Sequence, residues 1–446
     1  MSPTRIVVIG AGSAGCVIAA RLSEYPGHHV TLLEAGPDHR SAGTPAAIAG
    51  PSFVGAMSEP GRSWEGLVAT RAAGQEPAPY VRGRGVGGSS AINAMVALPG
   101  EPADYDSWER DHGCAGWGWH EVAPWFERTA LSLHHAPRHE WGALDLALAE
   151  VWPEAADGVL LTRTADGRRA SVNDCYLEPA RHRPNLVVRG DVLVDRVLLA
   201  GATATGVLLS GGEVLEADLV VVSAGAIHSP AVLLRSGVEL PGIGGNLRDH
   251  PSFRVALTRH QPADVGGLAV ATVAQLSVHP DDHDLQVIPM EYVDPEMPDL
   301  GLMMGALMHV HSSGSVRLVS SDPAVHPAVD FDMLSDDRDM AGLLRLVEAV
   351  ERTLEHPAMQ AVASPLPYDR SDAGLRAMVG DYVHAAGTCA MGTVVDMDCR
   401  VVAHTGLMVC DASVMPTVPR ANTHLPTVMI AERIAARTMA RLREGE

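Results

Sequence analysis

The stretch RIVVIGAGSAGCVIAARL, residues 5–22, decides the fold of this chain. Its first five residues form a short, β-branched apolar run, which is typical of a buried parallel strand. Gly10 allows a tight turn, Gly12 lets a pyrophosphate approach the backbone, and Gly15 lets the next helix pack closely on the strand. The helix amino terminus offers free N–H groups and a positive dipole end to phosphates. The stretch therefore predicts a strand–turn–helix cradle for a dinucleotide.

An acidic residue follows a second strand at the distance that such a cradle requires. Residues 30–33, VTLL, predict the strand, and Glu34 stands nineteen residues after Gly15. A carboxylate there can bind both hydroxyls of an adenosine ribose and would repel the 2′-phosphate of NADP. These signals leave NAD and FAD both open. The candidate cofactor-binding residues of this region are Gly10, Gly12, Ser13, Ala14, Gly15, Glu34 and Ala35.

The composition excludes several other classes of protein. The formal charge of −21 over 446 residues argues against a nucleic-acid or anionic-membrane partner. The chain contains no lysine, which excludes lysine Schiff-base chemistry and a Walker P-loop. Its six cysteines form no CxxC pair and are expected to be reduced structural thiols. We find no signal-peptide pattern and no apolar stretch of membrane-spanning length, so a cytoplasmic protein is expected.

The middle of the chain predicts the second half of a nucleotide-binding domain. Residues 185–199, 206–209 and 213–222 predict short antiparallel strands followed by a buried strand that ends in LVVVSAG. A small-residue turn then returns the chain towards the first cradle. A helix is expected to begin at Ser229, with Pro230 in its first turn.

The remaining patterns predict a second sheet and a covering helix. Residues 284–292 and 314–320 are expected to be strands, and residues 37–79, rich in Gly, Pro and Ala, an ordered loop or lid over the cofactor. Residues 339–355 predict an amphipathic helix. Its apolar positions at helical spacing are Leu343, Leu344, Val347, Val350 and Leu354.

Five segments, in order along the chain, resemble the glucose–methanol–choline oxidoreductases, a family of FAD-dependent alcohol oxidases and dehydrogenases. RGRGVGGSSAINAM at residues 82–95 resembles the first family signature, and GAIHSPAVLLRSG at residues 225–237 resembles the second. The other three similar segments are residues 104–126, 314–339 and 411–433. Because the resemblance runs nearly end to end, it is far more specific than any one motif.

The resemblance implies an α/β fold with two domains. A Rossmann-like FAD-binding domain would be discontinuous and comprise residues 1–130, 180–250 and 380–446. A substrate-binding domain would comprise residues 131–179 and 251–379, with an antiparallel sheet that roofs the flavin. The oligomeric state stays open.

The resemblance also implies how the flavin is held. Gly87, Gly88, Ser89, Asn93 and Ala94 would wrap the pyrophosphate and flavin side of the cofactor. A helix amino terminus near the ring would stabilise the anionic reduced flavin. Further implied contacts are Met95, Val194, Ala224, Asp411, Ala412, Thr427 and Val428. Ile92 stands where some relatives carry the histidine that attaches FAD covalently, so non-covalent FAD is expected.

Two residues resemble the catalytic pair of the family. His384, in YVHAAGTCAMG, matches the base, and a neutral imidazole suits removal of a hydroxyl proton. Asn422 matches the second position, where its amide could hold the substrate oxygen. His424 is either a structural residue or, with a shifted pairing, the second base. Arg420 is expected to form a surface salt bridge; the alternative is contact with a carboxylate-bearing substrate.

These features predict FAD-dependent oxidation of a small-molecule alcohol to an aldehyde or ketone, with electrons passed to O2 or another acceptor. Three alternatives are a hydroxynitrile lyase of the same fold, a non-catalytic flavoprotein and an NAD dehydrogenase. His309 and His311, two residues apart on one face of an expected strand, could bind a metal. No third ligand is evident, so we expect no metal site.

Overall fold

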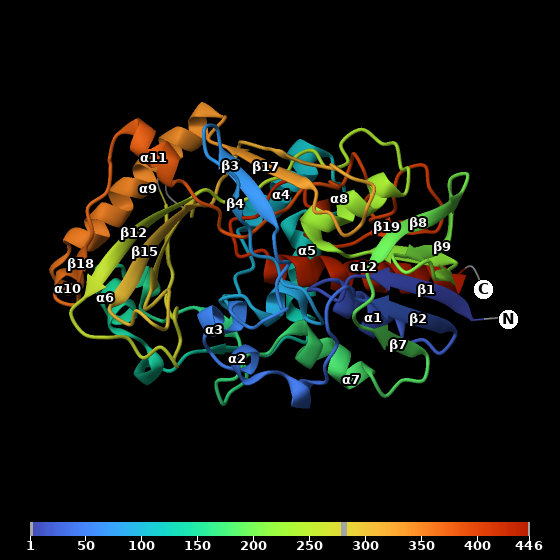
Figure 1. The fold of residues 1–446 in the computed structure, drawn as a ribbon, viewed down its shortest axis with the longest axis horizontal. Helices are drawn as coiled ribbons and strands as arrows, with labels where there is room; N and C mark the ends of the chain where they lie inside the picture. Colours follow the sequence, from blue (N-terminus) through green and yellow to red (C-terminus); the bar gives the residue numbers. More distant parts are fainter. Residues whose placement is uncertain (1–2, 278–282, 445–446) are drawn as a thin grey trace.

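The computed structural model describes residues 3–277 and 283–444. A five-stranded parallel sheet lies on the side of the molecule that holds both termini (Figure 1). In spatial order its strands are β19 (Leu407–Val409), β11 (Leu219–Val222), β1 (Thr4–Ile9), β2 (His28–Leu33) and β7 (Leu186–Arg189). Helix α1 (Gly15–Leu22) follows β1, so the predicted strand–turn–helix and the predicted α/β fold are confirmed.

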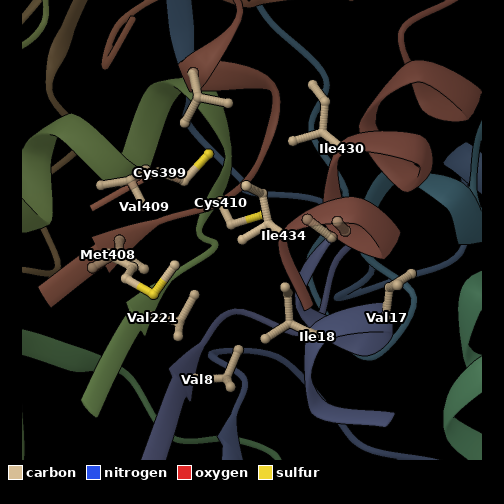
Figure 2. Close-up of a cluster of buried hydrophobic side chains, with 14 of the residues drawn as sticks. Val8, Val17, Ile18, Val221, Cys399, Met408, Val409, Cys410, Ile430 and Ile434 are labelled. Atoms are coloured by element: carbon tan, nitrogen blue, oxygen red, sulfur yellow. The ribbon is translucent and has the colours of Figure 1, made fainter. Parts of the chain in front are cut away.

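Two helices bury one face of this sheet. Figure 2 shows Val8 and Val221 of the sheet close to Ile18 of α1 and Ile434 of α12 (His424–Glu444). Each of these four side chains is at most 1% exposed. Both helices begin beside the first glycine turn, because Ser13 Oγ lies 2.9 Å from Nδ1 of His424. The packing therefore brings the first and last parts of the chain to one edge of the sheet.

A small antiparallel sheet precedes β11. It consists of β8 (Val194–Ala200), β9 (Thr203–Leu209) and β10 (Val214–Glu216). The antiparallel strands predicted here are confirmed for these three. β7, from the same predicted stretch, instead pairs in parallel with β2.

Helix α8 (Gly225–Arg235) begins four residues before the predicted start, so the expectation that Pro230 lies in its first turn was wrong. A proline inside a helix cannot donate to the carbonyl four residues earlier, here that of Ala226. The Thr388 hydroxyl donates to this carbonyl at 2.6 Å and replaces the missing bond. A side chain distant in sequence thus allows the helix to start early.

A second, antiparallel five-stranded sheet forms the other half of the molecule (Figure 1). In spatial order it contains β13 (Ala274–Leu276), β14 (Leu285–Met290), β15 (Leu300–Leu307), β12 (Ser252–Arg259) and β18 (Ala363–Pro365). The predicted amphipathic helix is α9 (Asp337–Glu355), which packs against this sheet. Leu344 was wrongly placed on its buried face, since that side chain is 41% exposed.

The alternation of side chains along β15 separates two apolar clusters. Met303 and Leu307 pack in the cluster that contains the buried side chains of α9. Leu302 and Met304 belong to a different cluster, together with Tyr382. Since successive residues of a strand point to opposite faces, one face of the sheet is closed by α9 and the other faces the interior of the molecule.

A four-stranded sheet corrects the expectation of a loop over residues 37–79. β3 (Val68–Ala72) lies within that segment and pairs in parallel with β17 (Ala328–Met333). The other two strands of this sheet are β4 (Ala78–Pro79) and β16 (Ser315–Arg317). The remaining elements are α2 (Ala46–Ala49), α3 (Phe53–Met57), α4 (Pro102–His112), α5 (Trp119–Glu127), α6 (Ala143–Val151), α7 (Glu178–Ala180), α10 (Pro357–Gln360), α11 (Asp372–Met378), β5 (Leu133–His135) and β6 (Leu160–Thr162).

Over residues 3–277 and 283–444, no helix combines the length and apolar character needed to cross a membrane. The boundaries expected for the two domains stay a prediction.

The bond between Thr388 and Ala226 predicts a stability difference. Thr388→Val keeps the side-chain shape but leaves the buried Ala226 carbonyl without a donor, so we expect the free energy of unfolding to fall by about 1–3 kcal/mol. Thr393→Val is the matched control, because Thr393 is exposed. Urea unfolding of both variants tests this, and equal midpoints would contradict the argument.

Candidate active site and dinucleotide cavity

One large cavity joins the two halves of the molecule. Its empty volume is about 2450 Å³, including the space at its mouth. Gly10 and Glu34 line one end, His384 and Asn422 line another part, and Met304 of β15 contributes to the wall. The cavity therefore extends from the glycine turn at Gly10 to His384 and Asn422, as a bound dinucleotide with a small substrate beside it would require.

Two glycine turns form the floor of the cavity at the parallel sheet. A Cβ on Gly15 would lie 1.8 Å from the Gly10 carbonyl oxygen, so only glycine lets α1 pack this closely on the turn. A Cβ on Gly88 would lie 2.7 Å from the Cα of Gly12, which brings the two turns into contact. A Cβ on Gly12 would meet nothing within 4 Å, so its backbone faces open space. The floor can thus accept a group that approaches the backbone directly.

The carboxylate of Glu34 ties these turns together. Its Oε2 accepts from the Ala11 N–H at 2.8 Å, and its Oε1 accepts from the N–H groups of Gly36 and Gly85 at 2.8 and 2.9 Å. Each carboxylate oxygen can accept two hydrogen bonds, so Oε2 keeps room for a ribose hydroxyl. The sequence did not predict that Glu34 joins these turns, because the spacing between Gly15 and Glu34 contains no signal for Gly85.

Most of the predicted cofactor-binding residues line the cavity. They are Gly10, Gly12, Ser13, Ala14, Glu34, Ala35, Gly88, Ser89, Asn93, Ala94, Met95, Val194, Ala224, Asp411, Ala412 and Thr427. Gly15, Gly87 and Val428 are not among the lining residues, and their part in binding the cofactor stays a prediction. Gly15 packs on Gly10, the Gly87 N–H donates to the Ala11 carbonyl, and Val428 is buried inside α12. These three residues pack behind the residues that line the cavity.

The predicted catalytic pair meets in the cavity. Nε2 of His384 lies 3.3 Å from Nδ2 of Asn422, and His384 is 8% exposed. Burial, together with the positive charge of Arg82, lowers the pKa of His384 well below its ordinary value. The imidazole is therefore neutral near physiological pH. A neutral imidazole has a lone pair on one of its nitrogens and can accept a proton from a bound hydroxyl.

The His384 backbone is held by Asp249. This buried carboxylate accepts from the His384 N–H at 3.0 Å and from the Tyr80 hydroxyl at 2.9 Å. The Tyr382 ring packs against the His384 ring with centroids 4.4 Å apart. The candidate base His384 is therefore held by Tyr80 and Asp249 from other parts of the chain and by the nearby Tyr382.

His250 is a second histidine at this site, which sequence reasoning missed. Its Nδ1 lies 2.9 Å from Nδ1 of His384. Burial lowers the pKa of His250 to about 3, so it is also neutral. His250 and His384 are 134 residues apart in the sequence, and no local motif marks the pairing.

His424 lies at the dinucleotide end of the cavity. Its Nδ1 bonds Ser13 Oγ in the first glycine turn, and its buried Nε2 has no hydrogen-bond partner. Burial lowers its pKa to about 4. These contacts connect His424 with the glycine turn.

The expectation that Arg420 forms a surface salt bridge was wrong. Arg420 is 6% exposed, and its Nε donates to Oδ1 of Asp104 in α4 at 2.7 Å. The Arg420 backbone N–H donates to the other Asp104 oxygen at 2.9 Å. This buried ion pair anchors the segment just before Asn422. The partners are 316 residues apart, so the sequence contains no signal for the pair.

His309 and His311 lie after the end of β15, so their expected place in a strand was wrong. Their ring centroids are 4.7 Å apart. Among the residues that the structure describes, the group with metal-ligand spacing is Asp249, His250 and His384. Because these side chains already bond one another and the neighbouring backbone, we assign no metal to them.

Comparisons with known proteins relate the whole chain to flavoenzymes. Models described as GMC oxidoreductase match residues 4–252 and 310–431. The chain is 32% identical to the 5-(hydroxymethyl)furfural oxidase of Methylovorus sp. (strain MP688), with 96% of this chain and 97% of that protein covered. It is 30% identical to the oxygen-dependent choline dehydrogenase 1 of Chromohalobacter salexigens, with 98% and 94% covered. The crystal structure of pyridoxine 4-oxidase from Mesorbium loti is similar, with a TM-score of 0.88 and 26% identity, covering 97% of this chain and 99% of that chain.

The buried ion pair of Arg420 and Asp104 predicts a large stability effect. Asp104→Asn removes the carboxylate that accepts from Nε and from the backbone N–H of Arg420, and we expect the free energy of unfolding to fall by about 3 kcal/mol. Asp111→Asn removes an exposed carboxylate that pairs with Arg110, so its unfolding midpoint in urea should match the parent protein. An Asp104→Asn variant as stable as Asp111→Asn would show that the pair contributes nothing.

Proposed function

The chain belongs to the glucose–methanol–choline oxidoreductase family, and from this premise we propose that His384 and Asn422 carry out its oxidation of an alcohol. The protein is an FAD-dependent oxidoreductase that acts on CH–OH groups. Bound FAD supplies the acceptor for the hydride that leaves the alcohol carbon. The product is an aldehyde or a ketone.

The observation that carries the proposal is the meeting of His384 and Asn422 in the cavity, 3.3 Å apart. His384 Nε2 takes the hydroxyl proton of the alcohol as the C–H bond breaks. The Asn422 amide donates a hydrogen bond to the substrate oxygen and stabilises its developing negative charge. The buried Asn422 Oδ1 has no partner, so this oxygen can accept a hydrogen bond from a ligand. Burial strengthens both interactions, because water is excluded from the site.

The residues of the cavity suit FAD. The open space over Gly12 and the amino terminus of α1 can hold a pyrophosphate, and Glu34 can bind a ribose. His424 Nε2, buried and without a partner, is available to a bound group. Ile92 lines the same cavity and carries no group that could bond covalently to the flavin. We therefore propose that FAD is bound without a covalent link.

The cavity wall favours an uncharged alcohol with an apolar body. Beside Tyr382, the apolar side chains on this part of the wall are Phe53, Met290, Leu302 and Met304. Arg254 of β12 also lines the cavity, and its Nη2 donates to the Asp381 carbonyl at 2.6 Å. The cavity carboxylates are engaged: Asp381 pairs with Arg71, and Asp411 accepts from Ser229 and two backbone N–H groups. Among the cavity residues that the structure describes, a quaternary ammonium substrate would therefore find no free carboxylate as a counter-charge. A small primary alcohol on an aromatic or other apolar group fits best.

The names of the relatives, oxidases and a dehydrogenase, do not support a lyase, and the match to the GMC oxidoreductases supports FAD and not NAD. The electron acceptor, O2 or another molecule, and the cytoplasmic location stay predictions.

Anaerobic mixing of the purified holoenzyme with a panel of alcohols tests the proposed base. We expect aromatic and other apolar primary alcohols to bleach the visible flavin absorbance, with choline far slower. His384→Ala should slow bleaching by about 10²- to 10⁴-fold, the usual contribution of a general base. His134→Ala, at an exposed position of β5, serves as the control and should bleach at the parent rate. A His384→Ala variant with bound FAD and the parent rate would refute the role of His384.

The link to the flavin can be tested separately. Acid precipitation of the yellow protein should release all flavin into the supernatant, because Ile92 offers no attachment point. Flavin absorbance that stays with the precipitated chain would contradict non-covalent binding and direct attention to another residue of the cavity wall.

A further inference from the structure

Two buried imidazoles face each other beside the proposed base. Nδ1 of His250 lies 2.9 Å from Nδ1 of His384, and the two ring planes are perpendicular. In a neutral imidazole one nitrogen carries a hydrogen and the other carries a lone pair. One of these Nδ1 atoms must therefore donate to the other. The remaining contacts of the two rings decide the direction.

The far nitrogen of His250 identifies the acceptor. Its Nε2 lies 3.1 Å from the carbonyl oxygen of Pro419. A carbonyl oxygen only accepts, so Nε2 of His250 must carry the hydrogen. The lone pair of a neutral His250 is then on Nδ1. It follows that Nδ1 of His384 is the donor between the two rings.

The far nitrogen of His384 leads independently to the same assignment. If its Nδ1 carries the hydrogen, its Nε2 has the lone pair. Nε2 lies 3.3 Å from Nδ2 of Asn422, and an amide nitrogen can only donate. The Pro419 carbonyl at one end and the Asn422 amide at the other thus require the same pair of tautomers.

We propose that His250 is a positioning residue that holds His384 as its Nδ1–H tautomer, so that the Nε2 lone pair faces the cavity. This inference rests on the proposed role of His384 as the base. In the opposite tautomer, Nε2 would present a hydrogen to the substrate hydroxyl and could not take its proton. With the observed contacts, the proton moves from the alcohol oxygen to Nε2, while the Nδ1–H bond to His250 stays in place.

The surroundings hold His250 in the orientation that this requires. The Asp249 carboxylate accepts the His250 N–H at 2.7 Å as well as the His384 N–H, so both backbones are tied to one group. The Tyr382 ring lies close to both imidazoles, with centroids 6.1 Å from His250 and 4.4 Å from His384. His250 is fully buried, so water cannot replace it as the acceptor for the His384 Nδ1–H.

Two substitutions at His250 separate the acceptor from the bulk of the ring. His250→Phe keeps a ring but has no acceptor, and we expect anaerobic flavin bleaching to slow by about 10- to 100-fold, as when a partner that orients a functional histidine is lost. His250→Asn keeps an oxygen near the position of Nδ1 and should restore most of the rate. His28→Phe is the control for losing a buried histidine, because His28 bonds the Leu22 carbonyl away from the cavity.

Nitrogen-15 NMR of the histidine-labelled holoenzyme reads the tautomer without using activity. We expect His384, identified by comparison with a His384→Gln spectrum, to show a protonated Nδ1 and an unprotonated Nε2. In His250→Phe this pattern should be lost, and in His250→Asn it should return. An unprotonated Nδ1 in the parent protein would overturn the inference even if neither variant folds.

The outcomes also separate this inference from the proposed function. Parent-like bleaching and an unchanged His384 spectrum in His250→Phe would overturn the positioning role but leave the base in place. Parent-like bleaching in His384→Ala would remove the base itself. Equal slowing in His250→Phe and His250→Asn, with an intact His384 tautomer in both, would reduce His250 to a packing residue.

Discussion

The parallel register of the central sheet is the constraint on which the rest of the structure depends. In a parallel sheet all strands end at the same edge, so the loops that follow them meet there. Gly10 follows β1, Glu34 follows β2, Ala224 follows β11 and Asp411 comes shortly after β19; all four line the cavity. The Ser223 hydroxyl, which donates to the Cys410 carbonyl at 2.8 Å, joins two of these loops directly. One backbone geometry thereby gathers residues from the whole length of the chain.

Burial then determines what the gathered side chains can do. A buried polar group is costly unless it is bonded, and in this cavity the carboxylates of Glu34, Asp381 and Asp411 are held by N–H, O–H or guanidinium donors. Among the described cavity residues, the buried polar atoms without a partner include Asn422 Oδ1, His424 Nε2 and His228 Nε2, which a ligand can satisfy. The same burial keeps the imidazoles of His384 and His250 neutral. The low polarity of the cavity thus favours uncharged substrates and keeps the proposed base, His384, unprotonated.

The antiparallel sheet also contributes to the cavity wall, because successive residues of its strands point to opposite faces of the sheet. One face of β15 packs on α9, while Leu302 and Met304 on the other face line the cavity. The alignment with the furfural oxidase extends over 526 positions, more than the 446 residues of this chain, so that relative contains segments that are missing here. The shorter chain nevertheless contains both sheets and the pair of His384 and Asn422 that meets in the cavity.

The sequence by itself determined the parts whose chemistry is local. The GAGSAG turn, Glu34, His384 and Asn422 could be predicted because a turn, a strand end or a signature needs particular residue types at fixed spacing. The helix over residues 339–355 could be predicted from its apolar period, although one turn position, Leu344, proved exposed. β3 was missed because its partner strand β17 lies more than two hundred residues away and its own segment resembles a loop.

Only the tertiary structure decided which distant side chains satisfy one another. The bond of Thr388 to Ala226, the burial of Arg420 against Asp104 and the pairing of His250 with His384 each join residues more than a hundred positions apart. Such partners are selected by packing and by the cost of an unpaired polar group, and neither leaves a periodic trace in the sequence. The proposed base His384 and the glycine turn for the dinucleotide were therefore predictable from the sequence. The groups that hold His384 in its orientation were not.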